Sequence, residues 1–227
     1  MHHMIEVLEP DDKFTVAEYK QKAIHIINTI LRKKKVPILV GGTGLYISAI
    51  VENYEIPQIP PNFELRNALQ MEAKKHGWER LYQKLREVDP MAAEQIDPKN
   101  IRYVIRALEI NAAGQKKSND KKQPLFDHFF VGIERSREDL YKRIEKRVDE
   151  QVRGGLVDEV SKLILKGYGE NLPAISALGV KELIPYLHGE ISLEEAMDKI
   201  KQNTRNYAKR QMTWFRRYKD IHWIQNA

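Results

Sequence analysis

The sequence contains no cysteine among its 227 residues, and this absence excludes several classes of protein. Without cysteine there is no disulfide scaffold, no thiolate metal site and no cysteine nucleophile. No apolar run approaches the length of a membrane span, and no signal-peptide hydrophobic region follows the first residues. No pair among the seven histidines has metal-ligand spacing. These absences indicate a soluble, intracellular protein without a structural metal.

The composition that remains is ordinary for a globular protein. Hydrophobic residues make up 42% of the chain and charged residues 31%, which argues against wholesale disorder. The length fits one large domain or two small ones and is sufficient to bury a hydrophobic core.

The net charge of +6 is concentrated in one segment near the C-terminus. The segment contains no acidic residue, and its Lys and Arg residues outnumber the whole net charge, so the rest of the chain is slightly acidic. Such a segment indicates a polyanion-binding surface, although a solvated helix face is the ordinary alternative. Its basic residues are Lys199, Lys201, Arg205, Lys209, Arg210, Arg216, Arg217 and Lys219.

The first part of the chain has the pattern of an α/β fold. Thr15 and Glu18 have capping-box spacing and begin a predicted helix with an apolar stripe. Val36–Val40 follows as a short apolar run, which predicts a buried parallel strand. A second strand is predicted over Phe129–Ile133. The order of helix, strand, glycine-rich loop and helix indicates an α/β fold.

The middle of the chain has helical signals only. Prolines after Tyr54 indicate a linker, Asn62 is a helix cap, and Asp89-Pro90 and Asp97-Pro98 predict the starts of further helices. The polar run of residues 115–123 predicts an exposed, mobile loop. We therefore expect an α/β core made of residues 1–53 and 128–227, with a helical insertion domain over residues 54–127.

Gly41–Tyr46, with the sequence Gly-Gly-Thr-Gly-Leu-Tyr, directly follows the first predicted strand and opens a helix. Successive glycines let backbone N–H groups converge on an anion or approach a base closely, and Thr43 adds a hydroxyl. The spacing fits neither a P-loop nor the dinucleotide motif G-x-G-x-x-G. From the residues alone, a purely structural turn is an equal alternative.

Two helices of the core carry further basic candidates. Arg143 and Arg147 lie four apart on a helix that Ser136 caps, and with Arg137 they could hold a pyrophosphate or pair with nearby acids. The last helix begins with a capping box at Ser192 and carries the basic segment. One of its faces combines cations with interleaved aromatic rings, which is typical of RNA binding. The residues of that face are Lys201, Arg205, Lys209 and Arg216, beside Tyr207, Trp214 and Phe215.

The insertion contains one more such group. Arg102, Tyr103 and Arg106 share one face of a predicted helix. Two arginines beside an aromatic ring can form a nucleic-acid surface, and an ordinary amphipathic helix is the alternative.

Four segments together resemble one family, the tRNA dimethylallyltransferases, also called tRNA isopentenyltransferases. They are Val40–Tyr46, Arg102–Glu109, Ala177–Glu182 and Tyr207–Arg216, of which the last is the most specific. The resemblance runs from the first residues to the last. It implies an α/β fold with a P-loop-kinase-like parallel-sheet core and a helical insertion domain.

The resemblance also implies a reaction. Members of this family transfer the dimethylallyl group of dimethylallyl pyrophosphate to N6 of the adenosine 3′-adjacent to the anticodon, in tRNAs reading U-starting codons. The adenine must leave its stack to react, and Mg²⁺ is expected in the complete enzyme to stabilise the leaving pyrophosphate. The implied partners are a tRNA anticodon stem-loop and dimethylallyl pyrophosphate, for a cytoplasmic monomer with no membrane partner.

Site residues follow from the resemblance by position. Thr43 is expected to contact the target adenosine, and Arg147, supported by Arg143, to stabilise the pyrophosphate. These three are the candidate catalytic residues. The implied tRNA contacts are Gly42, Thr43, Arg66, Arg102, Tyr103, Arg106, Ser176, Gly179, Lys181, Lys209, Arg210, Gln211, Trp214 and Arg216.

The chain departs from the family in one respect. The family's Walker-type loop, which binds the diphosphate, and its Asp-Ser segment, which supplies the general base, do not occur in this sequence. Met1–Ile5 resembles family sequence that lies after both. We therefore expect an N-terminally truncated enzyme that binds tRNA but is inactive alone. The alternatives are a non-catalytic RNA-binding derivative and a P-loop small-molecule kinase relative, which the missing Walker lysine disfavours.

Overall fold

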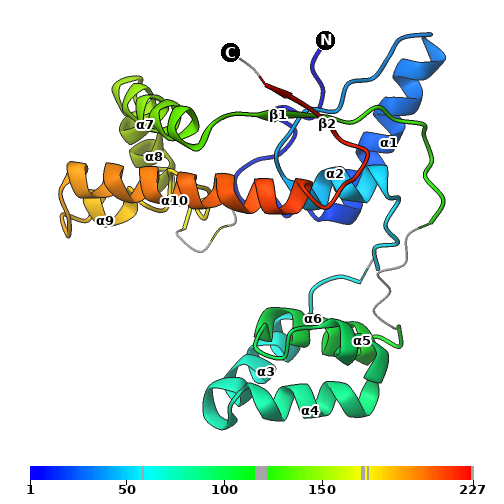
Figure 1. The fold of residues 1–227 in the computed structure, drawn as a ribbon. Coiled ribbons are helices and arrows are strands. Elements are labelled where there is room, and N and C mark those ends of the chain that lie inside the picture. The colour runs from blue at the N-terminus through cyan, green and yellow to red at the C-terminus, as the bar shows by residue number, and fades with distance from the viewer. Residues whose placement is uncertain (58, 116–121, 170–171, 173, 226–227) are drawn as a thin grey trace. The chain divides into compact units, whose positions relative to one another are not determined.

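The computed structural model describes residues 1–57, 59–115, 122–169, 172 and 174–225, and these form ten helices and two strands (Figure 1). The chain divides into two compact units. The core unit consists of residues 1–15, 25–47 and 126–227, and the helical unit of residues 16–24 and 48–125. Helices α1 (Val16–Arg32) and α2 (Gly44–Val51) contribute residues to both.

The expectations for the polar loop and for membrane-spanning helices can be checked only against the residues that the structure describes. Most of the loop expected over residues 115–123 lies outside the described residues. In the part of the chain that is described, no helix is both long enough and apolar enough to cross a membrane.

Four helices lie wholly within the helical unit, and two of them begin at a side-chain cap. Asn62 accepts a hydrogen bond from Leu65 N at 3.0 Å, and Asp89 accepts one from Ala92 N at 3.1 Å, so both predicted caps are confirmed. The helices are α3 (Phe63–His76), α4 (Trp78–Val88), α5 (Pro90–Gln95) and α6 (Ile101–Ala112).

The start predicted at Asp97-Pro98 is wrong. Helix α6 begins only at Ile101, because the Asp97 carboxylate accepts a hydrogen bond from Lys99 N at 3.0 Å and closes a separate turn before the helix. A short Asp side chain competes in this way with helix formation by bonding to nearby backbone N–H groups.

The four helices pack around a common apolar core. Leu81 and Leu85 of α4 are fully buried, and α6 contributes Val104 and Ala107 to the same cluster. Burial of a leucine side chain stabilises a fold by about 1.5–3 kcal/mol, so this cluster is what holds the unit together.

A buried carboxylate lies at one end of this core. Glu109 is 2% exposed and accepts hydrogen bonds from Arg66 at 2.8 and 2.9 Å, from Asn62 N at 2.6 Å and from Arg106. Burial raises the pKa of Glu109, but the hydrogen bonds from Arg66, Arg106 and Asn62 N outweigh it and hold the pKa below its ordinary value. The carboxylate therefore stays charged and ties α6 to the start of α3.

The core unit contains the remaining four helices and both strands. Ser136 accepts a hydrogen bond from Asp139 N, and Ser192 and Glu195 form a full capping box, so both predicted helix starts are confirmed. The long last helix packs against the helices over Arg137–Arg153 and Ile184–Leu187 (Figure 1), over an apolar cluster that includes Val148, Val160 and Ile200. The helices are α7 (Arg137–Arg153), α8 (Leu156–Leu165), α9 (Ile184–Leu187) and α10 (Leu193–Phe215).

The two strands form a parallel pair. β1 (Val131–Glu134) lies beside β2 (His222–Gln225), with Val131 opposite His222. β1 confirms the strand predicted over Phe129–Ile133, with its start two residues later. β2 is absent from the predictions, because four residues after a helix carry too weak a periodic pattern.

The buried strand predicted over Val36–Val40 is wrong. The segment is not assigned to a strand, and Val36, Ile38 and Val40 are 84%, 82% and 86% exposed. A buried parallel strand needs hydrogen-bonded neighbours and covered faces. The described residues contain only two strands, and these pair with each other.

We predict that Glu109→Gln destabilises the protein by about 3–5 kcal/mol, because it leaves two partly buried guanidinium groups without their counter-charge. Urea unfolding followed by circular dichroism measures the free energy of unfolding. Glu94→Gln is the matched control, since Glu94 is exposed and is expected to change stability by less than about 0.5 kcal/mol.

The same pair of variants gives a pH dependence. A lowered pKa in the folded state means that the Glu109 contribution is present above the ordinary pKa of about 4.3 and is lost as the pH falls through the folded-state pKa. The stability difference between wild type and Glu109→Gln is therefore expected to be full at pH 7 and to shrink below pH ~4. Equal unfolding midpoints for both Gln variants at pH 7 would contradict the role of Glu109.

Candidate functional site

The glycine turn, defined as residues 42–44, leads directly into α2. The carbonyl of Thr43 accepts hydrogen bonds from Tyr46 N at 3.0 Å and Ile47 N at 3.2 Å, so Thr43 begins the helix. Thr43 itself is exposed. The predicted helix after Gly41–Tyr46 is thereby confirmed, and an exposed residue stands at its positive end.

Helix α10 holds the glycine turn from the other side. Gln211 Nε2 donates a hydrogen bond to the carbonyl of Gly42 at 3.0 Å, across 169 residues of sequence. The indole of Trp214 lies so close to Gly44 that a Cβ at residue 44 would overlap the ring. The Arg217 guanidinium lies 4.1 Å from the centre of the same ring. Two segments that carry the family resemblance therefore meet in the core unit.

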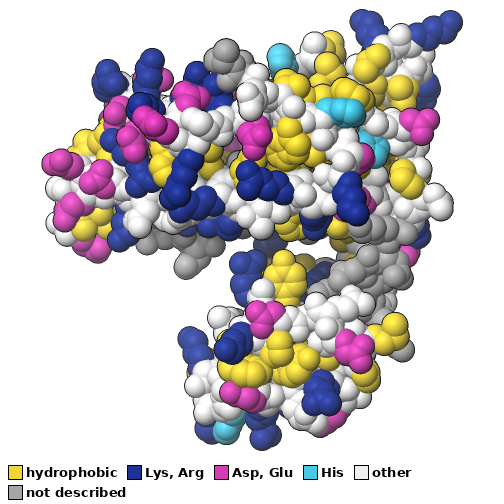
Figure 2. All heavy atoms as spheres, in the orientation of Figure 1, with side chains coloured by type: hydrophobic (Ala, Val, Ile, Leu, Met, Phe, Trp, Pro, Cys, Tyr) yellow, Lys and Arg dark blue, Asp and Glu magenta, His cyan; other side chains and the backbone are white. Residues whose placement is uncertain are grey.

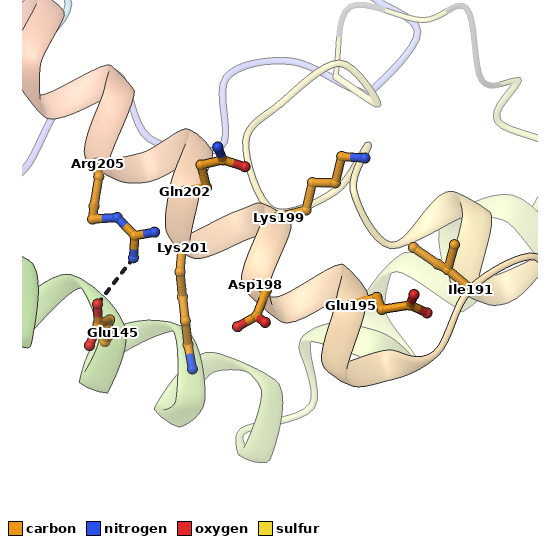
Figure 3. Close-up of a pocket in the computed structure, with 8 residues that line it drawn as sticks. All are labelled: Glu145, Ile191, Glu195, Asp198, Lys199, Lys201, Gln202 and Arg205. Carbon is orange, nitrogen blue, oxygen red and sulfur yellow. Dashed lines mark hydrogen bonds and ion pairs between the residues drawn. The ribbon is translucent and has the colours of Figure 1, made fainter.

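The basic face expected on α10 is partly paired within the molecule. Lys201 Nζ lies 2.7 Å from Asp149, Arg205 lies 3.1 Å from Glu145, and both acids belong to α7. Figure 3 shows Lys201 and Arg205 reaching from α10 toward α7, in a pocket that the paired charges line. Arg216 similarly lies 3.4 Å from Glu134 of β1. Lys201 and Arg205 therefore pair with acids of the same unit. The pairing is possible because Glu145 and Asp149 of α7 have the same spacing of four residues.

Lys209 and Arg210 lie between the paired Arg205 and Arg216 and are exposed. Desolvation raises the pKa of Tyr141, but hydrogen bonds and charges from Arg137 and Lys209 outweigh it and hold that pKa below its ordinary value. The Arg210 guanidinium lies 5.7 Å from the ring centre of Tyr207. Lys and Arg side chains follow the strip of surface that α10 occupies in Figure 1 (Figure 2). Two exposed cations that could meet a polyanion therefore lie in the C-terminal half of α10.

The arginines of α7 divide into paired and unpaired ones. Arg143 donates to Asp139 at 3.0 Å, and Arg135 binds the same carboxylate at 3.0 Å. Desolvation raises the pKa of Asp139, but hydrogen bonds from Arg143 and Arg135 outweigh it and hold that pKa low. Arg147 is exposed and makes no ion pair with any residue that the structure describes. Of the two expected pyrophosphate ligands, Arg143 is paired with Asp139, whereas Arg147 makes no ion pair with a described residue.

The loop of residues 176–181 is tied to α10 through one buried acid. Glu182 is 5% exposed, accepts a hydrogen bond from Gly179 N at 2.8 Å and accepts another from Asn203 Nδ2 at 2.8 Å. Gly179 has a φ of 95°, which favours glycine. Ser176 and Lys181 remain exposed on this loop. Glu182 therefore attaches this loop to α10, while the polar side chains of the loop face solvent.

The candidates in the helical unit are of two kinds. Arg66 and Arg106 bind Glu109 and are only partly exposed, whereas Arg102 and Tyr103 are exposed on α6. The first pair is oriented by the buried acid, and the second is directly accessible.

Two buried glutamates that orient these residues were not among the predicted site residues. Glu109 and Glu182 each end a segment that carries the family resemblance, but neither was assigned a role. A single acid within an apolar helical pattern, three residues after Arg106, was the only local signal for Glu109.

The described residues contain no cluster of three or more ligands for the magnesium ion that the resemblance implies. Across the described ranges, no group of three or more His, Asp or Glu side chains could hold a metal ion. Mg²⁺ in a complete enzyme therefore stays a prediction.

The fold of the core unit and the contacts of the glycine turn indicate a class of protein. An α/β unit whose basic, aromatic helix contacts a glycine turn is typical of proteins that bind nucleic acids or phosphates. The family model described as IPP transferase matches residues 1–218. The chain belongs to the IPP transferase family.

Curated relatives agree over nearly the whole chain. The chain is 48% identical over 227 residues to a tRNA dimethylallyltransferase of Alkaliphilus oremlandii, covering 98% of this chain and 72% of that protein. It is 45% identical to a tRNA dimethylallyltransferase of Pelotomaculum thermopropionicum, covering 99% of this chain and 73% of that protein.

Solved structures confirm the expected P-loop-kinase-like fold class. The full-length tRNA isopentenylpyrophosphate transferase from Bacillus halodurans matches with a TM-score of 0.69 and 38% identity, over 99% of this chain and 71% of that one. A eukaryotic dimethylallyltransferase acting on tRNA matches with a TM-score of 0.77 and 26% identity, over 96% of this chain and 58% of that one.

We predict that Gly44→Ala destabilises the protein by about 1–3 kcal/mol, because the added methyl group overlaps the Trp214 ring in a packed contact. Thermal unfolding and tryptophan fluorescence measure the loss of stability and the displaced ring. Gly41→Ala is the matched control, since a Cβ at residue 41 meets no atom within 4 Å. Equal melting temperatures for the two variants would contradict the contact.

Proposed function

We propose that this protein is a tRNA dimethylallyltransferase. On this proposal it transfers the dimethylallyl group of dimethylallyl pyrophosphate to N6 of the adenosine 3′-adjacent to the anticodon, in tRNAs reading U-starting codons. It acts in the cytoplasm as a monomer. The observation that carries the proposal is the contact of Gln211 and Trp214 with the glycine turn, because it places an exposed Thr43 beside a basic, aromatic helix.

The reaction assigns separate tasks to these residues. The N6 amine attacks C1 of the dimethylallyl group, the bond from C1 to oxygen breaks, and pyrophosphate leaves with the electron pair. The amine passes its proton to the general base that the family's Asp-Ser segment supplies. Thr43 contacts the adenosine, which has left its stack. Arg147, supported by Arg143, stabilises the negative charge on the departing pyrophosphate through its guanidinium.

The tRNA contacts are divided between the two units. In the core unit, Lys209, Arg210 and the loop of residues 176–181 bind the RNA backbone and loop. In the helical unit, Arg102 and Tyr103 are accessible for phosphate contact and base stacking, and Arg66 and Arg106 present the exposed parts of guanidinium groups that Glu109 orients.

We predict that Lys209→Ala combined with Arg210→Ala weakens binding to an anticodon stem-loop. Loss of two phosphate contacts is expected to reduce the slope of log affinity against log salt concentration by about 1.4–1.8, because fewer counterions are released. Fluorescence anisotropy at several salt concentrations measures both quantities.

The control is Lys162→Ala combined with Lys166→Ala, which removes the same charge from exposed positions on and just after α8. This variant is expected to retain the wild-type slope within error. If both double variants lose the same slope, the end of α10 is not a specific RNA surface.

We also predict that a polypeptide of these 227 residues binds the stem-loop but shows negligible transfer. The sequence contains no G-x-x-x-x-G-K-[ST] loop for the diphosphate, and none of the residues assigned above takes the proton from N6. Incorporation of labelled dimethylallyl groups into the stem-loop is the measurement. Robust transfer by a preparation whose intact mass corresponds to 227 residues would contradict this prediction.

A further inference from the structure

The side chain of Gln211 is turned toward the protein and not toward solvent. It is half-buried on α10, and its amide donates to the carbonyl of Gly42 at 3.0 Å. The carbonyl of Gly42 and the N–H of Thr43 belong to the same planar, trans peptide group. A hydrogen bond that fixes this carbonyl therefore also fixes the direction of the Thr43 N–H and the orientation of the residue that follows.

The absence of a side chain at residue 42 makes this contact possible. A Cβ there would overlap the Gln211 amide, whereas the φ of Gly42 is not in the left-handed region that favours glycine. Close approach of the amide, and not backbone conformation, is thus what residue 42 provides. The obstructed group is the end of a flexible side chain, so a methyl group at residue 42 displaces the amide without disturbing the packed core.

Thr43 is fixed from both sides in this arrangement. Its own carbonyl accepts hydrogen bonds from Tyr46 N and Ile47 N, which fix it to α2. The peptide group before it is held by Gln211, which α10 carries. Thr43 therefore has its backbone fixed at both ends while its side chain remains exposed.

We propose that Gln211, instead of making the direct tRNA contact that the resemblance implies, is a positioning residue that orients Thr43 toward the target adenine. This inference rests on the proposed function, in which Thr43 contacts the adenosine. The Thr43 hydroxyl accepts a hydrogen bond from the N6 amine, and the fixed peptide group sets the place of that hydroxyl. By holding the glycine turn, Gln211 thus makes the site specific for a base with an exocyclic amine.

The test compares two anticodon stem-loops that differ in one base. One carries adenosine at the target position and the other carries purine riboside, which lacks the N6 amine. Fluorescence anisotropy gives the ratio of their dissociation constants. A single hydrogen bond predicts a wild-type ratio of about 3–10 in favour of adenosine.

Gln211→Ala and Gly42→Ala are each expected to lower this ratio to near one while the salt slope stays at the wild-type value. The double variant is expected to lose no more than either single variant, because both remove the same hydrogen bond. Gln211→Glu keeps the shape of the side chain but lacks the amide donor, and is expected to behave like Gln211→Ala. Gln202→Ala, an exposed position on the same helix, is the control and is expected to retain the ratio.

The outcomes separate this inference from the proposed function. A wild-type protein that does not bind the stem-loop, or binds both RNAs equally, overturns the proposed contact of Thr43 with adenosine. A discriminating wild type together with a discriminating Gln211→Ala variant overturns the positioning role alone. A Gln211→Ala variant that weakens binding of both RNAs equally shows that Gln211 contacts RNA directly, and also overturns it.

Discussion

Helix α10 is the element to which the separate site segments of the core unit are attached. Asn203 binds Glu182, which holds the loop around Gly179, and Gln211 and Trp214 hold the glycine turn. Asn203 and Trp214 are about 17 Å apart along the helix axis, at 1.5 Å per residue. Because a helix does not stretch, segments that lie far apart in the sequence keep a constant separation. The candidate site is therefore only as well ordered as the attachment of α10 to α7.

That attachment depends on charge as well as on apolar packing. Ile200 is buried in the core cluster, and Lys201 and Arg205 pair with Asp149 and Glu145 at its edge. Such partly exposed pairs contribute little stability each, typically below about 1 kcal/mol. Their regular spacing fixes the register of two amphipathic helices instead. In the helical unit the buried Glu109 has a comparable ordering role, because a charged group in a core requires all of its partners to be in place.

Local interactions account for what could be predicted from the sequence. The caps at Asn62, Ser136 and Ser192 depend on neighbours three residues away, and the structure confirms all three. The error at Val36–Val40 has the opposite cause, because strand formation depends on partners elsewhere in the chain. Likewise, resemblance indicated the two segments that contain Gly42 and Gln211, but no periodicity could show that they touch. The acids of α7 that pair with Lys201 and Arg205 of α10 could likewise not be predicted.

The exposed segment Val36–Val40 has a consequence for how the polypeptide behaves in solution. It forms no ladder with either described strand, and three of its side chains are more than four-fifths exposed. Exposed runs of apolar, β-branched residues are prone to edge-to-edge association of strands. Pro37 interrupts this run, because it has no N–H to donate. Pro37 thus limits strand pairing through this segment, immediately before the turn that carries Thr43.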